Sequence, residues 1–302
     1  MKAMDLVLPA VEQFESRCLG VELEASLFNT LWLTMKRHAE GGVQNFSLPL
    51  LHDLSRFIHA MKSQGGHWNV GGQTLPTHYA VMRSAHPDYF SLGGDLAHFR
   101  DCIRRQDRPR LHTYSTLCLD MMHDWATCSG DDATTIALVQ GRALGGGFEA
   151  ALSADVVIAE EQSEFGLPEI MFGLFPCTGA MSLLSRRIGV FQAEKMMTNG
   201  RIYSAAELKA MGVIDEVCAR GEGERAVRNY ITSHARNRRA RLMVQRSRHR
   251  LAPLDYAELA KVVDEWADLA MELGAAELRV MDMLIRMQAG GSRLQGAAAQ
   301  GT

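Results

Sequence analysis

The chain has 302 residues, of which 47% are hydrophobic and 22% are charged, and its formal net charge is −3. This composition is typical of a globular protein and excludes a disordered chain, a collagen-like fibre and a small disulfide scaffold. The nearly balanced charge gives no reason to expect DNA or an anionic membrane as a partner. The six cysteines form no C-x-x-C pair, so we expect reduced thiols and no zinc site.

The N-terminal segment and the hydropathy pattern argue against export and against membrane insertion. Asp5 and Glu12 fall where a signal peptide needs an apolar segment. No window reaches the roughly 18 consecutive apolar residues that a membrane span requires. We therefore expect a cytoplasmic protein without a membrane span.

The first part of the chain predicts alternating strands and helices. Residues 31–35 form a short β-prone apolar run, and Ser47 precedes a proline at a place typical of a helix start. Apolar residues then recur at helical spacing up to Met61. Strands are expected over 78–82 and 89–92, and the second of these ends at a Gly93-Gly94 turn.

The middle of the chain repeats the order of strand, turn and helix. Asp95 is expected to open a helix, and a longer helix runs through Leu111 to Trp125. Residues 134–139 are the clearest buried strand, a glycine turn at 145–147 leads into a short helix that carries Glu149, and 155–159 form a further strand. This alternation predicts the α/β class.

The C-terminal part is predicted to be mostly helical. Ser204 and Glu207 have capping-box spacing before a helix that Gly212 ends, and an apolar stripe at helical spacing runs from Leu259 to Leu273. We divide the chain into a core with an N-terminal extension (1–200), a helical C-terminal region (201–288) and a disordered tail (289–302).

Several common catalytic motifs are absent from the sequence. The glycine-rich run at 141–147 lacks G-x-G-x-x-G spacing and is not followed by Lys-Ser/Thr, which excludes the dinucleotide and P-loop patterns. Neither G-x-S-x-G nor H-E-x-x-H occurs, and the histidines do not cluster with carboxylates at ligand spacing. We expect no metal and no cofactor.

Two glycine turns and two glutamates remain as candidates for chemistry. The turns at Gly93-Gly94 and 145–147 each end a strand and open a helix, so their amides lack helical partners. Two such turns facing each other would form an oxyanion hole of main-chain amides. Glu149 and Glu169 lie in apolar segments, which raise the pKa of a carboxyl group toward acid–base catalysis. Ordinary turn glycines and a helix-capping Glu149 are the alternative explanation.

These segments together resemble the crotonase (enoyl-CoA hydratase/isomerase) superfamily over about residues 25–225. The resemblance is carried by GGDL at 93–96, QGRALGGGFE at 140–149, Ala154-Asp155, FGLPEI at 165–170 and the G-x-x-P pattern at 173–176. Within the superfamily the chain is most similar to the diffusible-signal-factor synthases, which make cis-2-unsaturated fatty acid signals for quorum sensing. The N-terminal extension, LWLTM at 31–35 and YFSLGGDL at 89–96 carry this narrower resemblance.

The resemblance implies an α/β fold, a crotonase-like spiral of ββα units with a C-terminal helical region, assembled as a homotrimer or a dimer of trimers. It implies that the amides of Gly94 and Gly146 form the oxyanion hole and that Glu149 and Glu169 are the acid–base pair. Retention of both glutamates implies addition or removal of water. Which glutamate is the base stays open.

The implied activity is dehydration of a 3-hydroxyacyl thioester to the cis-2-enoyl form, followed by thioester hydrolysis that releases a free acid. The segment after Pro176 departs from the usual superfamily pattern, which favours an acyl carrier protein over coenzyme A (CoA) as the donor. An arginine cluster between Arg236 and Arg250 would suit an acidic carrier, CoA phosphates or RNA, or would simply be a solvated helix face. Leu144 and Trp266 are candidate contacts for the acyl chain, although the stripe that contains Trp266 also fits a core or a subunit interface.

Two other functions stay open from the sequence. One is an enoyl-CoA hydratase of fatty acid oxidation, which would act on CoA thioesters without hydrolysing them. The other is a regulatory protein that binds a sensor histidine kinase or RNA.

Overall fold

The computed structural model describes residues 11, 14–38, 42–128 and 132–298. Its strands are β1 (Leu19–Glu24), β2 (Thr30–Met35), β3 (His67–Val70), β4 (Gln73–Pro76), β5 (Tyr79–Ser84), β6 (Tyr89–Ser91), β7 (Thr134–Val139), β8 (Arg142–Leu144), β9 (Val156–Glu160), β10 (Glu164–Gly166), β11 (Ile202–Ser204) and β12 (Glu216–Cys218). Its helices are α1 (Leu48–Ser63), α2 (Leu96–Arg104), α3 (Arg108–Cys128), α4 (Gly146–Leu152), the 3-10 helix η2 (Pro168–Phe172), α5 (Ala180–Ile188), α6 (Val190–Thr198), α7 (Ala205–Ala210), α8 (Gly223–Ala235), α9 (Arg238–Leu251), α10 (Tyr256–Met271) and α11 (Ala275–Ala298).

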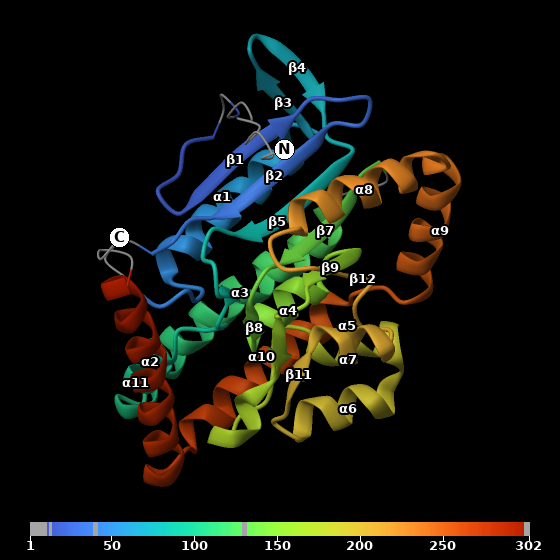
Figure 1. The fold of residues 1–302 in the computed structure, drawn as a ribbon. Coiled ribbons are helices and arrows are strands. Elements are labelled where there is room, and N and C mark those ends of the chain that lie inside the picture. The colour runs from blue at the N-terminus through green and yellow to red at the C-terminus, as the bar shows by residue number, and fades with distance from the viewer. Residues whose placement is uncertain (1–10, 12–13, 39–41, 129–131, 299–302) are drawn as a thin grey trace.

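The chain winds between two main sheets (Figure 1). The larger sheet has the order β1-β2-β5-β7-β9-β12, and the smaller has the order β11-β10-β8-β6. From β5 to β10 successive strands alternate between the two sheets, and the chain returns to the larger sheet through α2 and α3 or through α4. Neighbours β2, β5, β7 and β9 pair in parallel, as do β6, β8 and β10. The predicted crotonase-like spiral of ββα units is confirmed.

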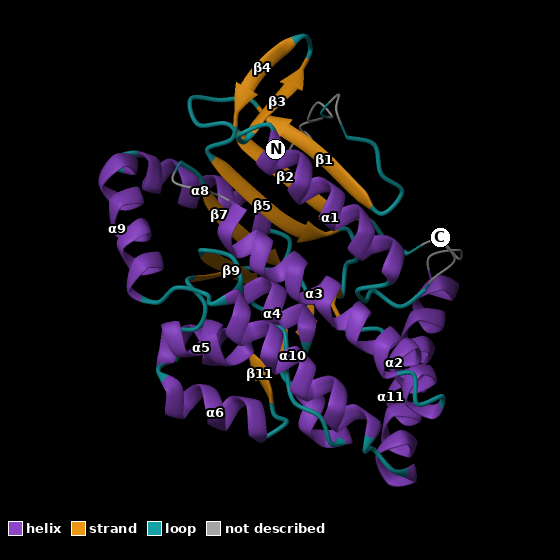
Figure 2. Ribbon diagram, turned by 180° about the vertical axis from the view of Figure 1, so that it is seen from behind, coloured by secondary structure: helices purple, strands orange, loops and turns teal. Residues whose placement is uncertain are grey.

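Helices cover both faces of the larger sheet, which explains why strand β7 is buried along its whole length. All six residues of β7 are buried, as expected for a strand covered on both sides. Ile136 and Leu138 pack with Val227 and Ile231 of α8, while Ala137 and Val139 face the core that α1, α3 and α4 build on the other side (Figure 2).

Local sequence signals set most helix boundaries as predicted. Ser47 is the N-cap of α1, which carries a proline in its first turn. The Asp95 carboxylate accepts hydrogen bonds from the Ala97 and His98 amides at the start of α2. Ser204 and Glu207 form the predicted capping box of α7.

Other elements were not predicted. β1 contains a glycine and two glutamates. It forms a strand because it pairs in antiparallel orientation with β2. The β3–β4 hairpin turns at Gly71 and Gly72, which both have positive φ. The three-residue strands β8, β10, β11 and β12 are too short to leave a periodic pattern and exist because neighbouring strands pair with them.

The expected disordered tail is wrong for residues 289–298, because α11 continues to Ala298. Alanine, leucine and glutamine are good helix formers, and they outweigh the glycines, which cost about 1 kcal/mol each in a helix. The remaining residues 299–302 lie outside the described part of the chain. The division of the chain into a core and a helical C-terminal region stays a prediction.

The C-terminal helices fold back onto the spiral. α10 packs against α3, and α11 packs against α2 and η2. Trp266 of α10 joins Leu96, Phe172 and Met281 in one buried cluster. Helix α9 lies apart from this region, at the edge of the molecule (Figure 1). Among the described residues, no helix is both long and apolar enough to cross a bilayer.

Candidate active site

The two predicted glycine turns meet in the structure. Gly93 follows β6 with φ +83°, and a Cβ built on it would lie 2.7 Å from the Leu144 carbonyl oxygen and 2.9 Å from the Gly146 nitrogen. A Cβ built on Gly146 would lie 3.7 Å from the Gly94 nitrogen. Only glycine at position 93 permits this close approach, since any side chain would collide with the facing turn.

The amides of Gly94 and Gly146 line one cavity. Neither amide has a hydrogen-bond partner within the described parts of the chain. Tyr114 of α3 fixes the first turn, because its hydroxyl donates to the Phe46 carbonyl oxygen at 2.5 Å and accepts from the Asp95 amide at 2.9 Å. Two adjacent, anchored amide donors of this kind can stabilise negative charge on a carbonyl oxygen.

Glu149, in the first turn of α4, is 2% exposed. Its carboxylate accepts hydrogen bonds from the Thr178 amide at 2.9 Å, the Thr178 hydroxyl at 2.6 Å and the Ala180 amide at 2.9 Å. Burial raises the pKa of Glu149, and the three donors counteract this rise because they stabilise the anion. Glu149 therefore has a fixed orientation and a partly compensated negative charge.

Glu169, in the first turn of η2, has different surroundings. Its Oε2 atom is buried without a hydrogen-bond partner among the described residues. Burial, with a smaller contribution from the nearby Glu149 charge, raises the pKa of Glu169 to about 8. A Cβ built on Gly145 would lie 2.5 Å from Glu169 Oε1, so glycine at position 145 leaves room for this carboxyl group. A carboxyl group with a pKa of about 8 is mostly protonated at neutral pH, whereas the three donors around Glu149 favour its anion.

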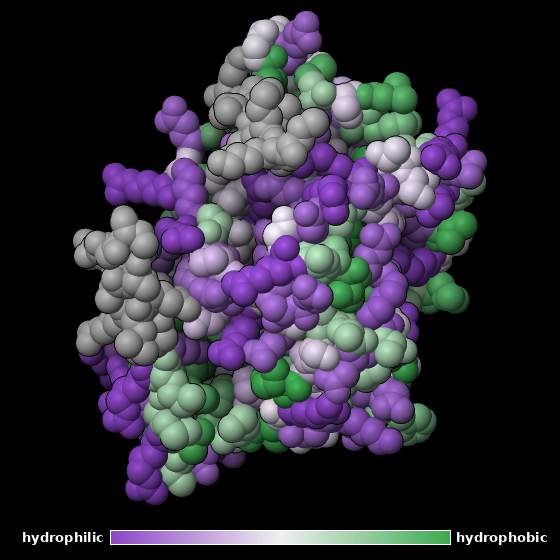
Figure 3. Space-filling view, in the orientation of Figure 1, coloured by the Kyte–Doolittle hydropathy of each residue, from purple (hydrophilic) through white to green (hydrophobic). Residues whose placement is uncertain are grey.

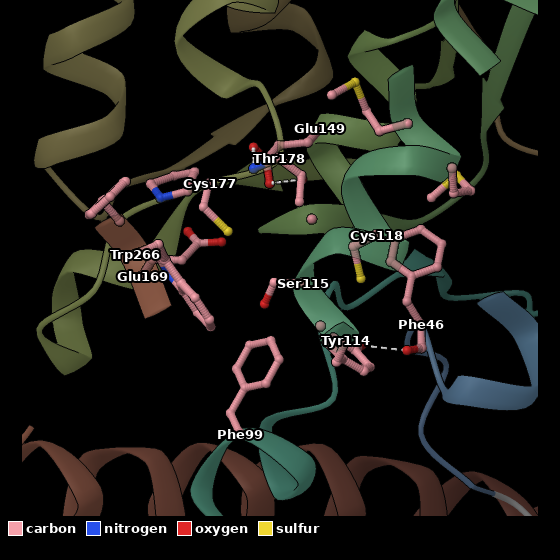
Figure 4. A pocket seen from close by; sticks show the side chains of 16 residues that line it. Phe46, Phe99, Tyr114, Ser115, Cys118, Glu149, Glu169, Cys177, Thr178 and Trp266 are labelled. Carbon is pink, nitrogen blue, oxygen red and sulfur yellow. Dashed lines mark hydrogen bonds between the residues drawn. The ribbon is translucent and has the colours of Figure 1, made fainter. Parts of the chain in front are cut away.

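Both glutamates and both amides line a cavity of about 50 Å³ whose remaining wall is largely apolar (Figure 4). Aromatic and sulfur-containing side chains form most of that wall, among them Phe46, Phe99, Met121, Met122 and Cys177. Such a chamber excludes water from the carboxyl groups and strengthens electrostatic interactions inside it.

A second hollow, of about 370 Å³, shares Gly94, Phe99, Glu169 and Trp266 with the cavity and is also lined by Arg142 and Gln288. Leu144, the other predicted acyl contact, lines this hollow but not the inner cavity. Leu284 and Met287 of α11 close its far side. The structure thus brings together every residue that the sequence suggested for the site, with Leu144 on the outer side.

The arginine cluster is not part of this site. None of Arg236, Arg239 and Arg241 lines the cavity or the adjoining hollow. Helix α9 carries Arg239 and Arg241 together with the exposed hydrophobic residues Met243 and Val244, and hydrophobic side chains interrupt the hydrophilic surface along that edge (Figure 3). Within one chain, therefore, the cluster does not flank the route to the glutamates.

Sequence reasoning missed three contributors to the site. Thr178 holds Glu149, Tyr114 anchors the first glycine turn, and Ser115 places a hydroxyl in the cavity wall. Thr178 left one signal, since it lies in the segment after Pro176 that departs from the superfamily pattern. Tyr114 and Ser115 left none, because they lie on the inner face of an ordinary amphipathic helix.

The described residues contain no group of three or more His, Cys, Asp or Glu side chains that could hold a metal ion. The described side chains of Cys18, Cys102, Cys118, Cys177 and Cys218 are free thiols. Two main-chain amides and a carboxyl pair in one cavity are groups that can stabilise an enolate and move protons beside it.

Comparison with known proteins identifies the family. A family model described as enoyl-CoA hydratase/isomerase matches residues 76–273, which is more than half of the chain and contains all four predicted catalytic positions. The chain belongs to the enoyl-CoA hydratase/isomerase family.

Individual relatives match parts of the chain. A probable enoyl-CoA hydratase of Mycobacterium bovis is 32% identical over 138 residues, which cover 46% of this chain and 50% of the relative. The mitochondrial methylglutaconyl-CoA hydratase of Rattus norvegicus is 28% identical over 193 residues, which cover 62% of this chain and 54% of the relative. The chain thus spans about half the length of these curated relatives.

A crystal structure of a putative enoyl-CoA hydratase from Streptomyces avermitilis has a TM-score of 0.69, 17% identity and 91% coverage of both chains, and supports the fold. None of these three relatives is described as a signal synthase, so the narrower resemblance stays a prediction.

Proposed function

We propose that the protein adds water across, or removes it from, the C2–C3 bond of an acyl thioester. The observation that carries this proposal is the enclosure of two main-chain amides and two carboxyl groups in one largely apolar cavity. Membership of the enoyl-CoA hydratase/isomerase family supports the same reaction type.

The amides of Gly94 and Gly146 bind the thioester oxygen. A proton on C2 of a thioester is only weakly acidic, and its removal places negative charge on that oxygen. Losing one donor of such a pair typically raises the barrier by about 3–4 kcal/mol. The cavity wall keeps water from competing for these donors.

The hydrogen-bond surroundings of the two glutamates support a division of roles, because three donors favour the anion of Glu149 and Glu169 Oε2 has no donor among the described residues. In the hydration direction, the water oxygen bonds to C3 while ionised Glu149 takes a proton from that water. Protonated Glu169 gives its proton to C2. In dehydration, the pair's single proton starts on Glu149. Glu169 removes the proton from C2 while Glu149 protonates the departing oxygen, so that water and a 2-enoyl thioester form.

The narrower proposal is a synthase of a cis-2-unsaturated fatty acid signal. In this reading the substrate is a 3-hydroxyacyl chain on acyl carrier protein, and water attacks the thioester carbonyl after dehydration to release the free acid. The same two amides would bind the oxyanion of that second step, and a glutamate would activate the water. The support for this reading is the sequence resemblance. The homotrimer and a sensor histidine kinase partner stay predictions that belong with it.

An enoyl-CoA hydratase that leaves the thioester intact is the second candidate. The names of the Mycobacterium bovis and Rattus norvegicus relatives favour this candidate. The two candidates share the proton transfers and differ in the donor and in the release of free acid.

Mass spectrometry of the products from 3-hydroxydodecanoyl-acyl carrier protein and from the matching CoA thioester separates the candidates. Glu149→Gln and Glu169→Gln variants are the controls. Free cis-2-enoic acid from the carrier-bound substrate, lost in both variants, is the result expected of a signal synthase. Reversible hydration of the CoA thioester without free acid identifies a hydratase. No turnover of either substrate contradicts both.

A further inference from the structure

Ser115, on the inner face of α3, has a hydroxyl group that lines the cavity of the two glutamates and forms no hydrogen bond with the described residues. The residue is 2% exposed, and its Oγ atom has no hydrogen-bond partner within the described parts of the chain. Ser115 lines the same cavity as the two glutamates. Figure 4 shows its hydroxyl leaving α3 and pointing into the open space of the cavity, on the side of Glu169 and Trp266.

Other hydroxyls of α3 behave differently. Thr113 donates to the Pro109 carbonyl oxygen at 2.8 Å, and Thr127 donates to the His123 carbonyl oxygen at 2.8 Å. This bond to the carbonyl four residues earlier is the usual solution for a hydroxyl within a helix. Ser115 does not form it. A buried hydroxyl without a partner is energetically unfavourable, and a ligand that supplies the partner removes this cost.

The chemistry of an acyl thioester identifies which of its atoms fits. The thioester oxygen is taken by the amides of Gly94 and Gly146, and the hydrogen on C2 by Glu169. The remaining polar atom close to the reacting carbons is the oxygen at C3, as a hydroxyl or as the water that becomes it. A water molecule in an apolar cavity needs two to four polar partners, and Glu149 alone is too few. Ser115 can donate to this oxygen or accept from it.

We propose that the Ser115 hydroxyl binds the C3 oxygen of the substrate in the cavity that Glu149 and Glu169 share, during addition or loss of water. This inference rests on the proposed function and adds a substrate-contacting residue to it. In dehydration the C3–O bond breaks, the oxygen takes the proton of Glu149, and the C2–H bonding electrons form the double bond while Glu169 keeps the C2 proton. Ser115 exchanges no proton; its hydrogen bond stabilises the charge that develops on the departing oxygen.

Two reactions of one enzyme test this assignment. Hydration of a 2-enoyl-CoA requires the C3 oxygen, whereas exchange of the C2 protons of butyryl-CoA with deuterated water requires only Glu169 and the amides. Ser115→Ala is expected to lower kcat/KM for hydration about tenfold, the size of one hydrogen bond. The same change is expected to alter the exchange rate less than twofold.

Matched variants keep the test specific. Thr113→Ala removes an exposed hydroxyl from the same helix and is expected to change neither rate, and Ser115→Thr, which keeps a hydroxyl, is expected to restore hydration at least in part. Equal losses in both reactions for Ser115→Ala, or no loss in either, overturn the role of Ser115 while leaving the proposed function intact. Failure of the unmodified enzyme to hydrate any 2-enoyl thioester overturns the proposed function and this inference with it.

Discussion

Two buried carboxylate sites in this molecule have opposite properties. The Asp155 side chain is 4% exposed and accepts hydrogen bonds from the Thr135 amide and hydroxyl, from Arg248 and from His249. Burial alone would raise its pKa, but His249, Arg248 and the Thr135 donors lower the pKa below the ordinary value. Glu169, by contrast, has an unpartnered oxygen and a pKa raised to about 8.

The difference shows that burial by itself does not decide what a carboxylate does. The Asp155 carboxylate accepts hydrogen bonds on both oxygens and links the starts of β7 and β9 to α9, which is a structural role. Glu149 and Glu169 line one cavity, where Glu149 accepts three hydrogen bonds and Glu169 Oε2 has no partner among the described residues. The incompletely satisfied pair is the site where a substrate can take the remaining interactions.

The largest expected effect contrasts these two sites directly. Glu149→Gln or Glu169→Gln is expected to reduce kcat/KM at least a hundredfold, the range of general acid–base catalysis, with little loss of stability. Asp155→Asn is expected to lower the free energy of unfolding by about 1–3 kcal/mol, because it weakens the charge-assisted hydrogen bonds from Arg248 and His249, while the folded enzyme keeps its turnover. Steady-state kinetics and urea unfolding measure the two effects. Loss of turnover in a folded Asp155→Asn variant would remove the distinction.

A second contrast concerns neighbouring glycines. Gly145→Ala places a methyl group 2.5 Å from Glu169 Oε1 at a residue with φ +52°, so it displaces the catalytic carboxyl and strains the backbone. We expect at least a tenfold loss of kcat. A methyl group on Gly146 meets nothing closer than 3.7 Å, and Gly146→Ala keeps the amide, so we expect no more than a threefold loss. Kinetics on both variants check this, and equal losses would contradict the role given to position 145.

The opposite pKa shifts predict opposite effects of pH on stability. The unfolded chain releases the Glu169 proton near the ordinary value of 4.5, whereas the folded protein holds it to about 8. The folded state therefore loses stability as pH rises from about 4.5 to 8, by a few kcal/mol at most. Asp155 contributes stability above its ordinary value of 3.8, and that stability is lost as pH falls toward its lowered folded pKa.

Urea unfolding over a range of pH isolates the Glu169 effect. The stability of the Glu169→Gln variant relative to the unmodified protein is expected to increase between pH 5 and pH 8, since glutamine does not ionise. A constant difference over this range would show that Glu169 titrates normally in the folded state.

The smallest expected effect concerns α9. Arg239→Ala with Arg241→Ala is expected to change kcat/KM for a CoA thioester less than twofold, because neither residue lines the cavity or the adjoining hollow. The matching measurement with a carrier-protein substrate is informative: a selective loss of tenfold or more would show that the carrier docks on α9, and an equal, small effect is what the single-chain geometry predicts.

The sequence alone determined the α/β class, most helix boundaries and four positions of the site. Apolar periodicity predicted β7 and α10, capping residues predicted the starts of α2 and α7, and glycines at the ends of strands pointed to Gly94 and Gly146. These signals are local, because a cap, a turn or an amphipathic stripe is fixed by residues within a few positions of one another.

Only the tertiary structure decided how these parts act together. It brings Gly93 against Gly146 across more than fifty residues of chain, places Thr178 on Glu149 and leaves the Ser115 hydroxyl facing the cavity. It also gives Asp155 different surroundings from Glu149 and Glu169, although the local sequence does not distinguish the burial of these three carboxyl groups. The physical reason is that a carboxylate's pKa and an amide's availability depend on partners contributed by distant segments, and no local pattern records which segments meet.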